Sequence, residues 1–150
     1  MSILTAASSS SCWRGYEYFE DGRVAGLEEI GDGRFRAKVS GNGSAPYKVE
    51  IDIDHPRKSS CSCPHAAGRR IVCKHMVATY FAAFPQEAQH YYDELLRAED
   101  EWEEELEKRA DSMVKYVRSL KKKEAQDRLL EVLQMGPEWL WDRFFQDYVQ

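Results

Sequence analysis

The chain has 150 residues, 43% of them hydrophobic and 31% charged, a composition typical of a globular protein with one domain, or with one small domain and a helical extension. Its formal net charge is −5, which argues against a protein that coats nucleic acid without selectivity. Residues 1–90 carry 11 basic and 10 acidic residues, whereas residues 91–150 carry 10 basic and 16 acidic ones, so the acidity belongs to the second part.

Cysteine usage and hydropathy indicate a reducing, cytoplasmic setting. Residues 1–11 lack the basic start and the apolar stretch of a secretory signal, and no apolar run reaches the length of a membrane span. Cys61 and Cys63 are too close to bridge each other without strain, and Cys12 stands alone. In a reducing compartment, clustered cysteines more often hold metal, and no membrane partner is expected.

The first part of the chain predicts a small antiparallel β-meander. Residues 1–11 end in a run of serines without periodicity and are expected to form a disordered leader. Residues 13–53 carry strand signals, with apolar and polar side chains alternating over 34–39 and 47–53. Glycines at 22, 31, 33, 41 and 43 mark the turns, so three or four strands are expected.

The outward positions of two of these strands are charged. They are Arg34, Arg36 and Lys38 on one strand and Lys48, Glu50 and Asp52 on the next. A basic stripe for phosphate groups is one interpretation, and cross-strand pairing with the acidic residues is the other. We favour pairing, because opposite charges on neighbouring strands stabilise a sheet by a few tenths of a kcal/mol each, roughly.

The remainder of the chain is predicted to be helical. A helix is expected from about Lys74 to Phe84, ended by Pro85. Further helices are expected over 86 to about 110, over 112–118, after an N-cap at Ser119, and from Pro137 onward, with Gly136 ending the third of them. The aromatic residues of the last helix must pack on the preceding helix or on a partner, and packing is favoured for at least half of them.

Together these elements predict an α+β fold: a small antiparallel β-meander with a tied loop and helix, followed by a helical C-terminal segment. The expected divisions are a leader over 1–11, the meander with the cysteine-containing loop and helix over 12–85, and an acidic helical segment over 86–150.

Three cysteines and one histidine form the pattern that carries chemistry, C-x-C-x9-C-x-H. The residues are Cys61, Cys63, Cys73 and His75. Three thiolates and one imidazole are a complete tetrahedral zinc set, which leaves no position for a reactive water. His65 is the competing fourth ligand, but His75 is favoured because it leads into a helix that fixes its ring. The sequence therefore predicts a structural zinc ion and no metal-based catalysis.

The loop around these ligands is basic. Residues 55–75 contain five cations and no acidic residue: Arg57, Lys58, Arg69, Arg70 and Lys74. A Cys3His zinc site contributes a net charge of −1, so a surplus of about +4 remains. Screening of the thiolates is one interpretation of these cations, and binding of phosphate groups is the other.

The segment Cys61-Ser62-Cys63-Pro64 with Cys73-Lys74-His75-Met76 resembles the SWIM zinc finger, defined by C-x-C, a variable gap and C-x-H. The segments 13–15, 39–41 and 46–49 also resemble the strands that precede the finger in free-standing bacterial members. The resemblance implies that Cys61, Cys63, Cys73 and His75 bind zinc, and that the partner is DNA or a protein of chromatin, transposition or recombination. The chain lacks the helicase, transposase or kinase domain found beside such fingers.

Two functions follow as hypotheses. The first is a nucleic-acid-binding accessory protein that contacts DNA through Arg57, Lys58, Arg69, Arg70 and Lys74. The second is an adaptor that docks a larger DNA-processing enzyme, such as a helicase or transposase-type protein, through the acidic and aromatic helices. An enzyme is not expected, because the sequence contains no glycine-rich phosphate loop and no open metal site, and Cys12 is expected to be incidental.

Overall fold

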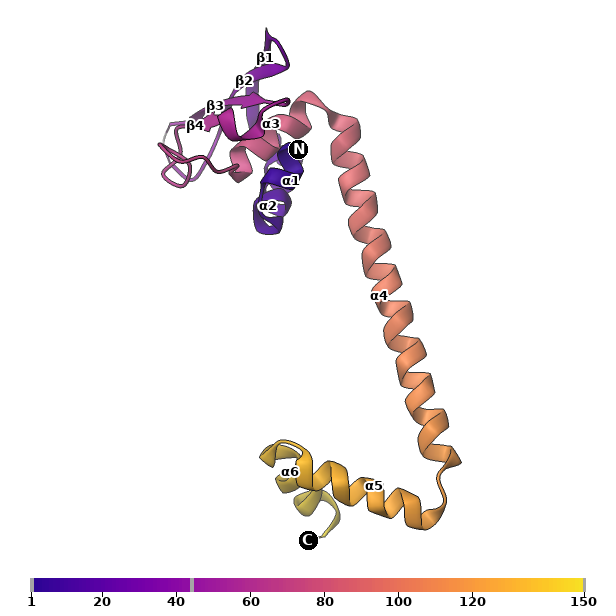
Figure 1. Cartoon of the computed structure of the whole chain (residues 1–150). Coiled ribbons are helices and arrows are strands. Elements are labelled where there is room, and N and C mark those ends of the chain that lie inside the picture. The colour runs from indigo at the N-terminus through magenta and orange to yellow at the C-terminus, as the bar shows by residue number, and fades with distance from the viewer. Residues whose placement is uncertain (1, 44, 150) are drawn as a thin grey trace. The chain divides into compact units, whose positions relative to one another are not determined.

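The computed structural model describes residues 2–43 and 45–149 and divides the chain into two compact units, Met1–Leu95 and Leu96–Gln150 (Figure 1). The division falls inside a helix, α4, rather than at Pro85 where the sequence placed it. In the described residues the first unit contains the sheet and the first helices: α1 (Ile3–Ala6), α2 (Ser9–Glu20), β1 (Val24–Gly31), β2 (Arg34–Val39), β3 (Tyr47–Asp52), the 3-10 turn η1 (Pro56–Lys58), β4 (Ser60–Cys61) and α3 (Lys74–Ala83).

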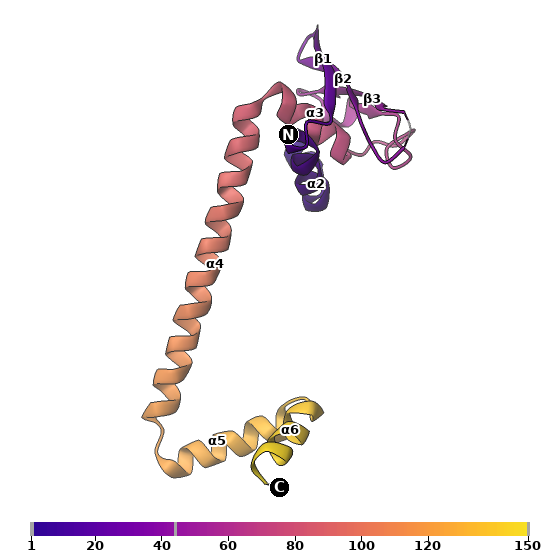
Figure 2. The same ribbon diagram turned by 180° about the vertical axis from the view of Figure 1, so that it is seen from behind.

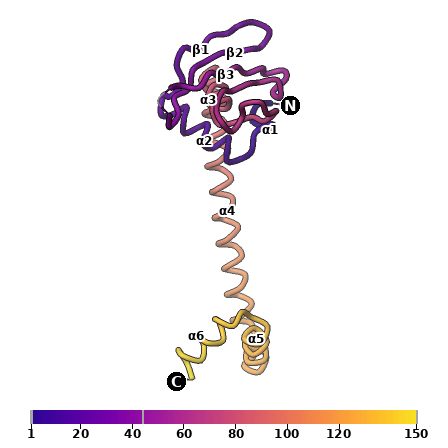
Figure 3. Tube along the Cα trace, turned by 90° about the vertical axis from the view of Figure 1, so that its left-hand side faces the viewer, coloured from indigo at the N-terminus to yellow at the C-terminus, as the bar shows by residue number. Residues whose placement is uncertain are grey.

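The four strands form one antiparallel sheet in sequential order, β1-β2-β3-β4. The antiparallel meander of β1 to β3 lies within the residues where strands were predicted, whereas β4 lies beyond them. Helix α3 packs against the sheet on one side and against α1 and α2 on the other, an arrangement that Figures 2 and 3 show from two further directions. The α+β fold class is confirmed, and so is a helical C-terminal segment.

The alternating pattern of the strands explains which side of the sheet is covered. Val39, Val49 and Ile51 point into the core, where they are at most 1% exposed. Met76 and Phe81 of α3 meet them there and are fully buried. Burying apolar area in this way contributes about 25 cal/mol per Å², so the layer between sheet and α3 is the main source of stability for the first unit.

The outward charges of β2 and β3 pair as the favoured interpretation required. Arg36 lies opposite Glu50, and its guanidinium is 3.5 Å from that carboxylate. Arg34 approaches the same carboxylate at 3.9 Å. Lys38 instead lies opposite Lys48, so the pairing does not extend to this end of the ladder. The sheet therefore keeps little unpaired positive charge over Arg34 and Arg36.

The prediction of a disordered leader is wrong for the described residues 2–11. Ile3 of α1 is 1% exposed and packs in the core, and the Ser2 side chain caps α1 by accepting from Thr5 N–H. The Ser8 side chain caps α2 in the same way, by accepting from Ser11 N–H. Ser8, the first residue of the serine run, is thus a helix cap, a role that serine takes readily because its hydroxyl satisfies a free amide.

Residues 13–20 are helical, so the strand prediction that began at residue 13 is also wrong there. This segment packs against α3 as a helix, with Gly15 at the point of close contact. A Cβ at this position would lie 2.5 Å from Val77 Cβ and 2.9 Å from the Lys74 carbonyl oxygen. Glycine is thus required by the close approach of the two helices, even though it lowers the helix propensity of this segment.

In the second unit the described residues form the later part of α4 (Pro85–Ser119), α5 (Lys122–Met135) and α6 (Glu138–Tyr148). α4 is one helix where the sequence predicted two. Ser112 lies inside it, and its hydroxyl donates to the Lys108 carbonyl, 2.8 Å away, instead of capping a new helix. Ser119 is the last residue of α4 and not an N-cap, and the N-cap of α5 is Lys121, whose N–H donates to Glu124.

The end of α5 and the start of α6 agree with the prediction. Gly136 is the C-cap of α5 and Pro137 is the N-cap of α6. Leu133 is 9% exposed, and it is the one buried hydrophobic side chain among the described residues of α5 and α6. Among the described helices, none is both long enough and apolar enough to cross a membrane.

Candidate metal centre

Two chain segments deliver the four predicted ligands. Cys61 ends β4, and Cys63 follows two residues later, after the strand has ended. Cys73 is the N-cap of α3 in an extended conformation, and His75 lies in the first turn of that helix. The prediction that Cys73 and His75 sit where the loop enters the helix is confirmed, because the extended Cys73 lets residues two apart face the same side.

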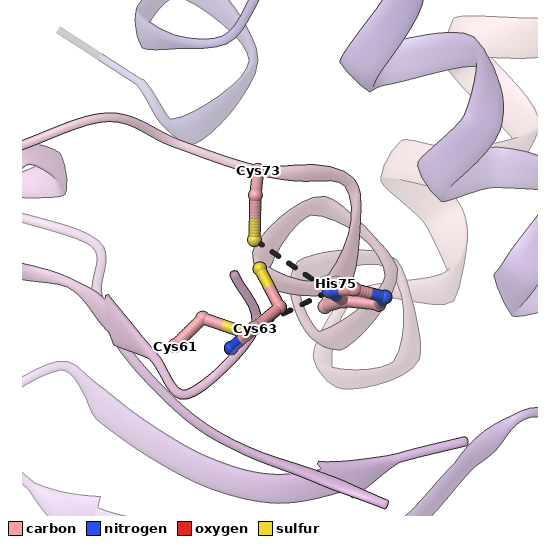
Figure 4. A group of neighbouring side chains, drawn as sticks. All are labelled: Cys61, Cys63, Cys73 and His75. Carbon is pink, nitrogen blue, oxygen red and sulfur yellow. Dashed lines mark hydrogen bonds between the residues drawn. The ribbon is translucent and has the colours of Figure 1, made fainter. Parts of the chain in front are cut away.

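The ligand atoms of Cys61, Cys63, Cys73 and His75 all lie within 4.8 Å of one another, and all four residues are buried (Figure 4). The Nδ1 atom of His75 is 3.7 Å from Cys61 Sγ and 3.8 Å from Cys73 Sγ. A tetrahedral zinc ion with Zn–S of about 2.3 Å and Zn–N of about 2.0–2.1 Å requires sulfur and nitrogen to be roughly 3.6 Å apart. The donors present therefore fit zinc in number, type and spacing.

The electrostatics of the cluster also favour a cation. The pKa of the Cys73 thiol is lowered, first by a hydrogen bond from the Cys61 thiol and then by His75, with the amides at the start of α3 contributing. The pKa of Cys61 is raised, because it gives its proton to that hydrogen bond and because it is buried. Several thiolates cannot share this small buried volume unless a metal ion balances their charge.

The short loop around Cys61 and Cys63 is fixed to the sheet by hydrogen bonds. Ser62 N–H donates to the Lys48 carbonyl at 3.0 Å, and Lys48 N–H donates to the Ser62 hydroxyl at 2.9 Å. After Cys63 the chain turns, with the amides of Ala66 and Ala67 both donating to the Cys63 carbonyl. The sheet thus holds one ligand pair and α3 holds the other, so a bound ion ties the two layers together.

Two tyrosines that sequence reasoning missed hold the ring of His75. Its ring centroid is 4.7 Å from that of Tyr47 and 5.4 Å from that of Tyr18. His75 Nε2 is buried and has no hydrogen-bond partner among the described residues. Packing between aromatic rings therefore orients this ligand, where a hydrogen bond from the second ring nitrogen would usually do so. The helical spacing of Gly15 and Tyr18 was the signal available in the sequence.

The competing and incidental residues lie elsewhere. His65 is exposed and is not among the four residues of the cluster. Cys12 is buried in α2, where its thiol is 3.5 Å from the Leu4 carbonyl, and burial raises its pKa. A raised pKa makes a thiol less reactive, and the burial of Cys12 agrees with a packing role.

The five residues predicted to contact nucleic acid do not all lie together. Arg57, Lys58 and Arg70 line one hollow of about 690 Å³, together with Asp54, His55 and Pro56. Arg69 is exposed on the same loop but does not line this hollow. Lys74 does not line the hollow either. Its ammonium group donates to Tyr18 Oη at 2.7 Å and lies 4.1 Å from the centre of that ring.

Comparison with known protein families covers this region of the chain. Residues 47–84 match the family model of the SWIM zinc finger. The matched segment, called the SWIM finger below, contains the whole metal cluster and covers about a quarter of the chain. It does not include residues 13–15 or 39–41, so the wider resemblance remains a prediction. Searches of curated proteins and of solved structures gave no match.

The SWIM finger runs from the start of β3 to the residue after α3. It therefore begins in the sheet and ends with the helix, the two layers that the metal joins. Zinc is therefore the cofactor of this module, held by Cys61, Cys63, Cys73 and His75.

Proposed function

We propose that this chain is a zinc-stabilised nucleic-acid-binding accessory protein, with DNA as the expected polymer. The observation that carries the proposal is the grouping of Arg57, Lys58 and Arg70 around one hollow beside the metal loop. Three cations and the Asp54 carboxylate line it, a net of +2 with His55 neutral. Phosphate groups are the natural ligands for such a cluster, because lysine and arginine bind them while releasing counterions.

The surroundings of these cations support the proposal. None of Arg57, Lys58 and Arg70 has an ion-pair partner among the described residues, in contrast to Arg34 and Arg36 on the sheet. The turn that carries Arg57 and Lys58 is held in place by the buried Pro56, and the Ser59 hydroxyl accepts from Asp52 N–H at 3.0 Å. Cations fixed on an ordered turn lose less conformational entropy on binding than cations on a free chain.

A binding role also agrees with the composition of the metal site. Four protein donors complete the zinc shell, so the ion would stabilise the fold and would have no position for a reactive water. We therefore propose a module that binds and does not catalyse. Any catalysis in its setting would come from a partner.

The test replaces Arg57, Lys58 and Arg70 together by glutamine in the full chain, which removes three positive charges. If each residue contacts a phosphate, a plot of the logarithm of the duplex-DNA binding constant against the logarithm of salt concentration should become less steep. The magnitude of its negative slope should decrease by about 2.7, at roughly 0.9 per contact. Fluorescence anisotropy with a labelled duplex, across about 50 to 200 mM salt, measures this. The matched control removes Arg34, Arg36 and Lys38, which changes the net charge equally but should leave the slope nearly unchanged.

If the salt slope decreases equally in the two triple variants, the effect comes from net charge alone, and the assigned surface is rejected. Binding by the unmodified chain that ignores salt would reject a phosphate contact altogether.

Exposed aromatic residues favour a second candidate function, an adaptor that docks a larger protein through α6. Trp139 is 62% exposed and Trp141 is 51% exposed, and no described residue of α6 is buried. The expectation that at least half of the α6 aromatics are core residues is therefore wrong for this chain on its own. Aromatic side chains held on a helix surface in this way are enriched at protein interfaces.

Ending the chain after Gly136 tests this candidate, since the cut removes α6 and keeps α5. We expect the shortened chain to stay soluble, to keep its zinc and to elute without aggregation in size-exclusion chromatography with light scattering. Aggregation of the shortened chain would instead assign the aromatic residues to the core and would reject the docking role.

A further inference from the structure

We infer that two copies of this chain associate through the part of α4 in the second unit, with the two helices antiparallel. The inference concerns a surface separate from the SWIM finger and from α6. It rests on an exposed apolar stripe, on the division of charge along the helix, and on one cation within the stripe.

The stripe consists of Trp102, Leu106, Met113 and Tyr116. These side chains are 60%, 46%, 66% and 54% exposed, respectively. At 3.6 residues per turn they fall within an arc of roughly 80° on the helix. Their spacings of four, seven and three residues are those of the core positions of a coiled coil. A single helix with such a stripe gains by burying it against another helix.

Charge decides which helix can cover this stripe. Residues 99–107, here called the acidic block, contain seven carboxylates and no cation. Residues 108–119, here called the basic block, complete α4 and contain four cations and one carboxylate. Within the described residues, one member of the acidic block, Glu104, forms an ion pair, with Lys108 at 3.1 Å. Most of these charges are thus free to meet a partner.

A second copy in the antiparallel direction brings the acidic block of each chain alongside the basic block of the other. Packed helices lie 8–10 Å apart, within about one Debye length at physiological salt, so this attraction is felt. A parallel pair would place seven carboxylates against seven carboxylates and would be repelled. The chain therefore carries on one helix both halves of a complementary charge pattern, which a second copy supplies reciprocally.

Arg109 supports the same direction. It falls inside the stripe, and its guanidinium has no ion-pair partner among the described residues. One polar residue at a core position fixes the register of a coiled coil because it must find a polar partner. In the antiparallel pair the acidic block of the other copy supplies carboxylates for it.

The test uses the full zinc-bound chain in sedimentation equilibrium over a range of concentrations. The unmodified chain should reach twice the chain mass of 17.4 kDa, and Leu106→Glu should weaken association at least tenfold. The matched control is Val114→Glu: Val114 lies on the same helix and is also 46% exposed, but it sits roughly 80° beyond the stripe. This control should leave association unchanged.

Two further measurements fix the direction. Raising the salt concentration should weaken an antiparallel pair and strengthen a parallel one. Zero-length coupling of carboxylates to lysines, in a mixture of light- and heavy-nitrogen chains, should join the acidic block of one copy to Lys115 of the other. A chain that stays monomeric at all concentrations, or equal losses in Leu106→Glu and Val114→Glu, would overturn the inference. Zinc content and DNA affinity are measured on the same variants, so a failure here is separable from a failure of the proposed function.

Discussion

Replacing Cys73 by serine is expected to release the zinc ion and unfold the SWIM finger. Cys73 caps α3, and its Sγ atom lies 3.8 Å from His75 Nδ1. Structural zinc contributes about 10–16 kcal/mol in zinc-finger peptides, whereas a whole domain is stable by about 5–15 kcal/mol. Losing the zinc ion with one thiolate would therefore remove free energy comparable to the whole stability of the first unit.

Zinc per chain by elemental analysis and thermal melting by circular dichroism measure this outcome. The unmodified chain should bind one zinc and melt cooperatively, and a strong chelator should reproduce the effect of Cys73→Ser. Cys12→Ser is the matched control, because Cys12 is also buried but lies outside the metal cluster. A Cys73→Ser protein that still holds a full equivalent of zinc, with an unchanged melt, would contradict the assignment of the ligands.

The second large effect is expected at Phe81, where alanine should lower the free energy of unfolding of the first unit by about 3–5 kcal/mol. Phe81 is fully buried in α3, and its ring is 6.0 Å from that of Tyr16 and 5.5 Å from that of Tyr91. Three helices therefore meet on this side chain, and their separate anchoring leaves the resulting cavity little room to collapse. The van der Waals contacts that Phe81 loses on several sides add to the free energy lost because its ring is no longer buried away from water.

Urea unfolding, followed by far-ultraviolet circular dichroism in zinc-containing buffer, measures the change. Trp13→Ala is the comparison, because Trp13 is larger than Phe81 but 43% exposed, and it should cost clearly less. Equal losses for the two variants would mean that Phe81 is not the centre of the packing. Zinc content should stay at one per chain in both, which separates a core effect from a ligand effect.

The local patterns of the sequence were sufficient for the sheet and for the metal ligands. Alternation over 34–39 and 47–52 identifies β2 and β3, since a side-chain period of two admits no other regular structure. The two ligand pairs were also readable, because zinc demands a fixed set of donors at short range. Both predictions depend on neighbours within a few residues of one another.

The features that the sequence did not reveal depend on distant contacts. α1 and α2 are short helices with weak periodicity, and their stability comes from packing Ile3 and Gly15 against α3, more than sixty residues away in the sequence. The same applies to Tyr18, whose place beside His75 follows from that packing. The grouping of Arg57 and Arg70 around one hollow likewise required the folded loop.

The N-terminal segment and the metal loop are joined at one further point. Ala7, between α1 and α2, forms a parallel β-bridge with Val72, the residue before Cys73. Ile3 is buried a few residues earlier. A purification tag or fusion partner placed ahead of Ser2 would therefore lie only a few residues from the segment that positions a zinc-binding sulfur. Recombinant versions intended for metal analysis should carry such additions at the opposite terminus.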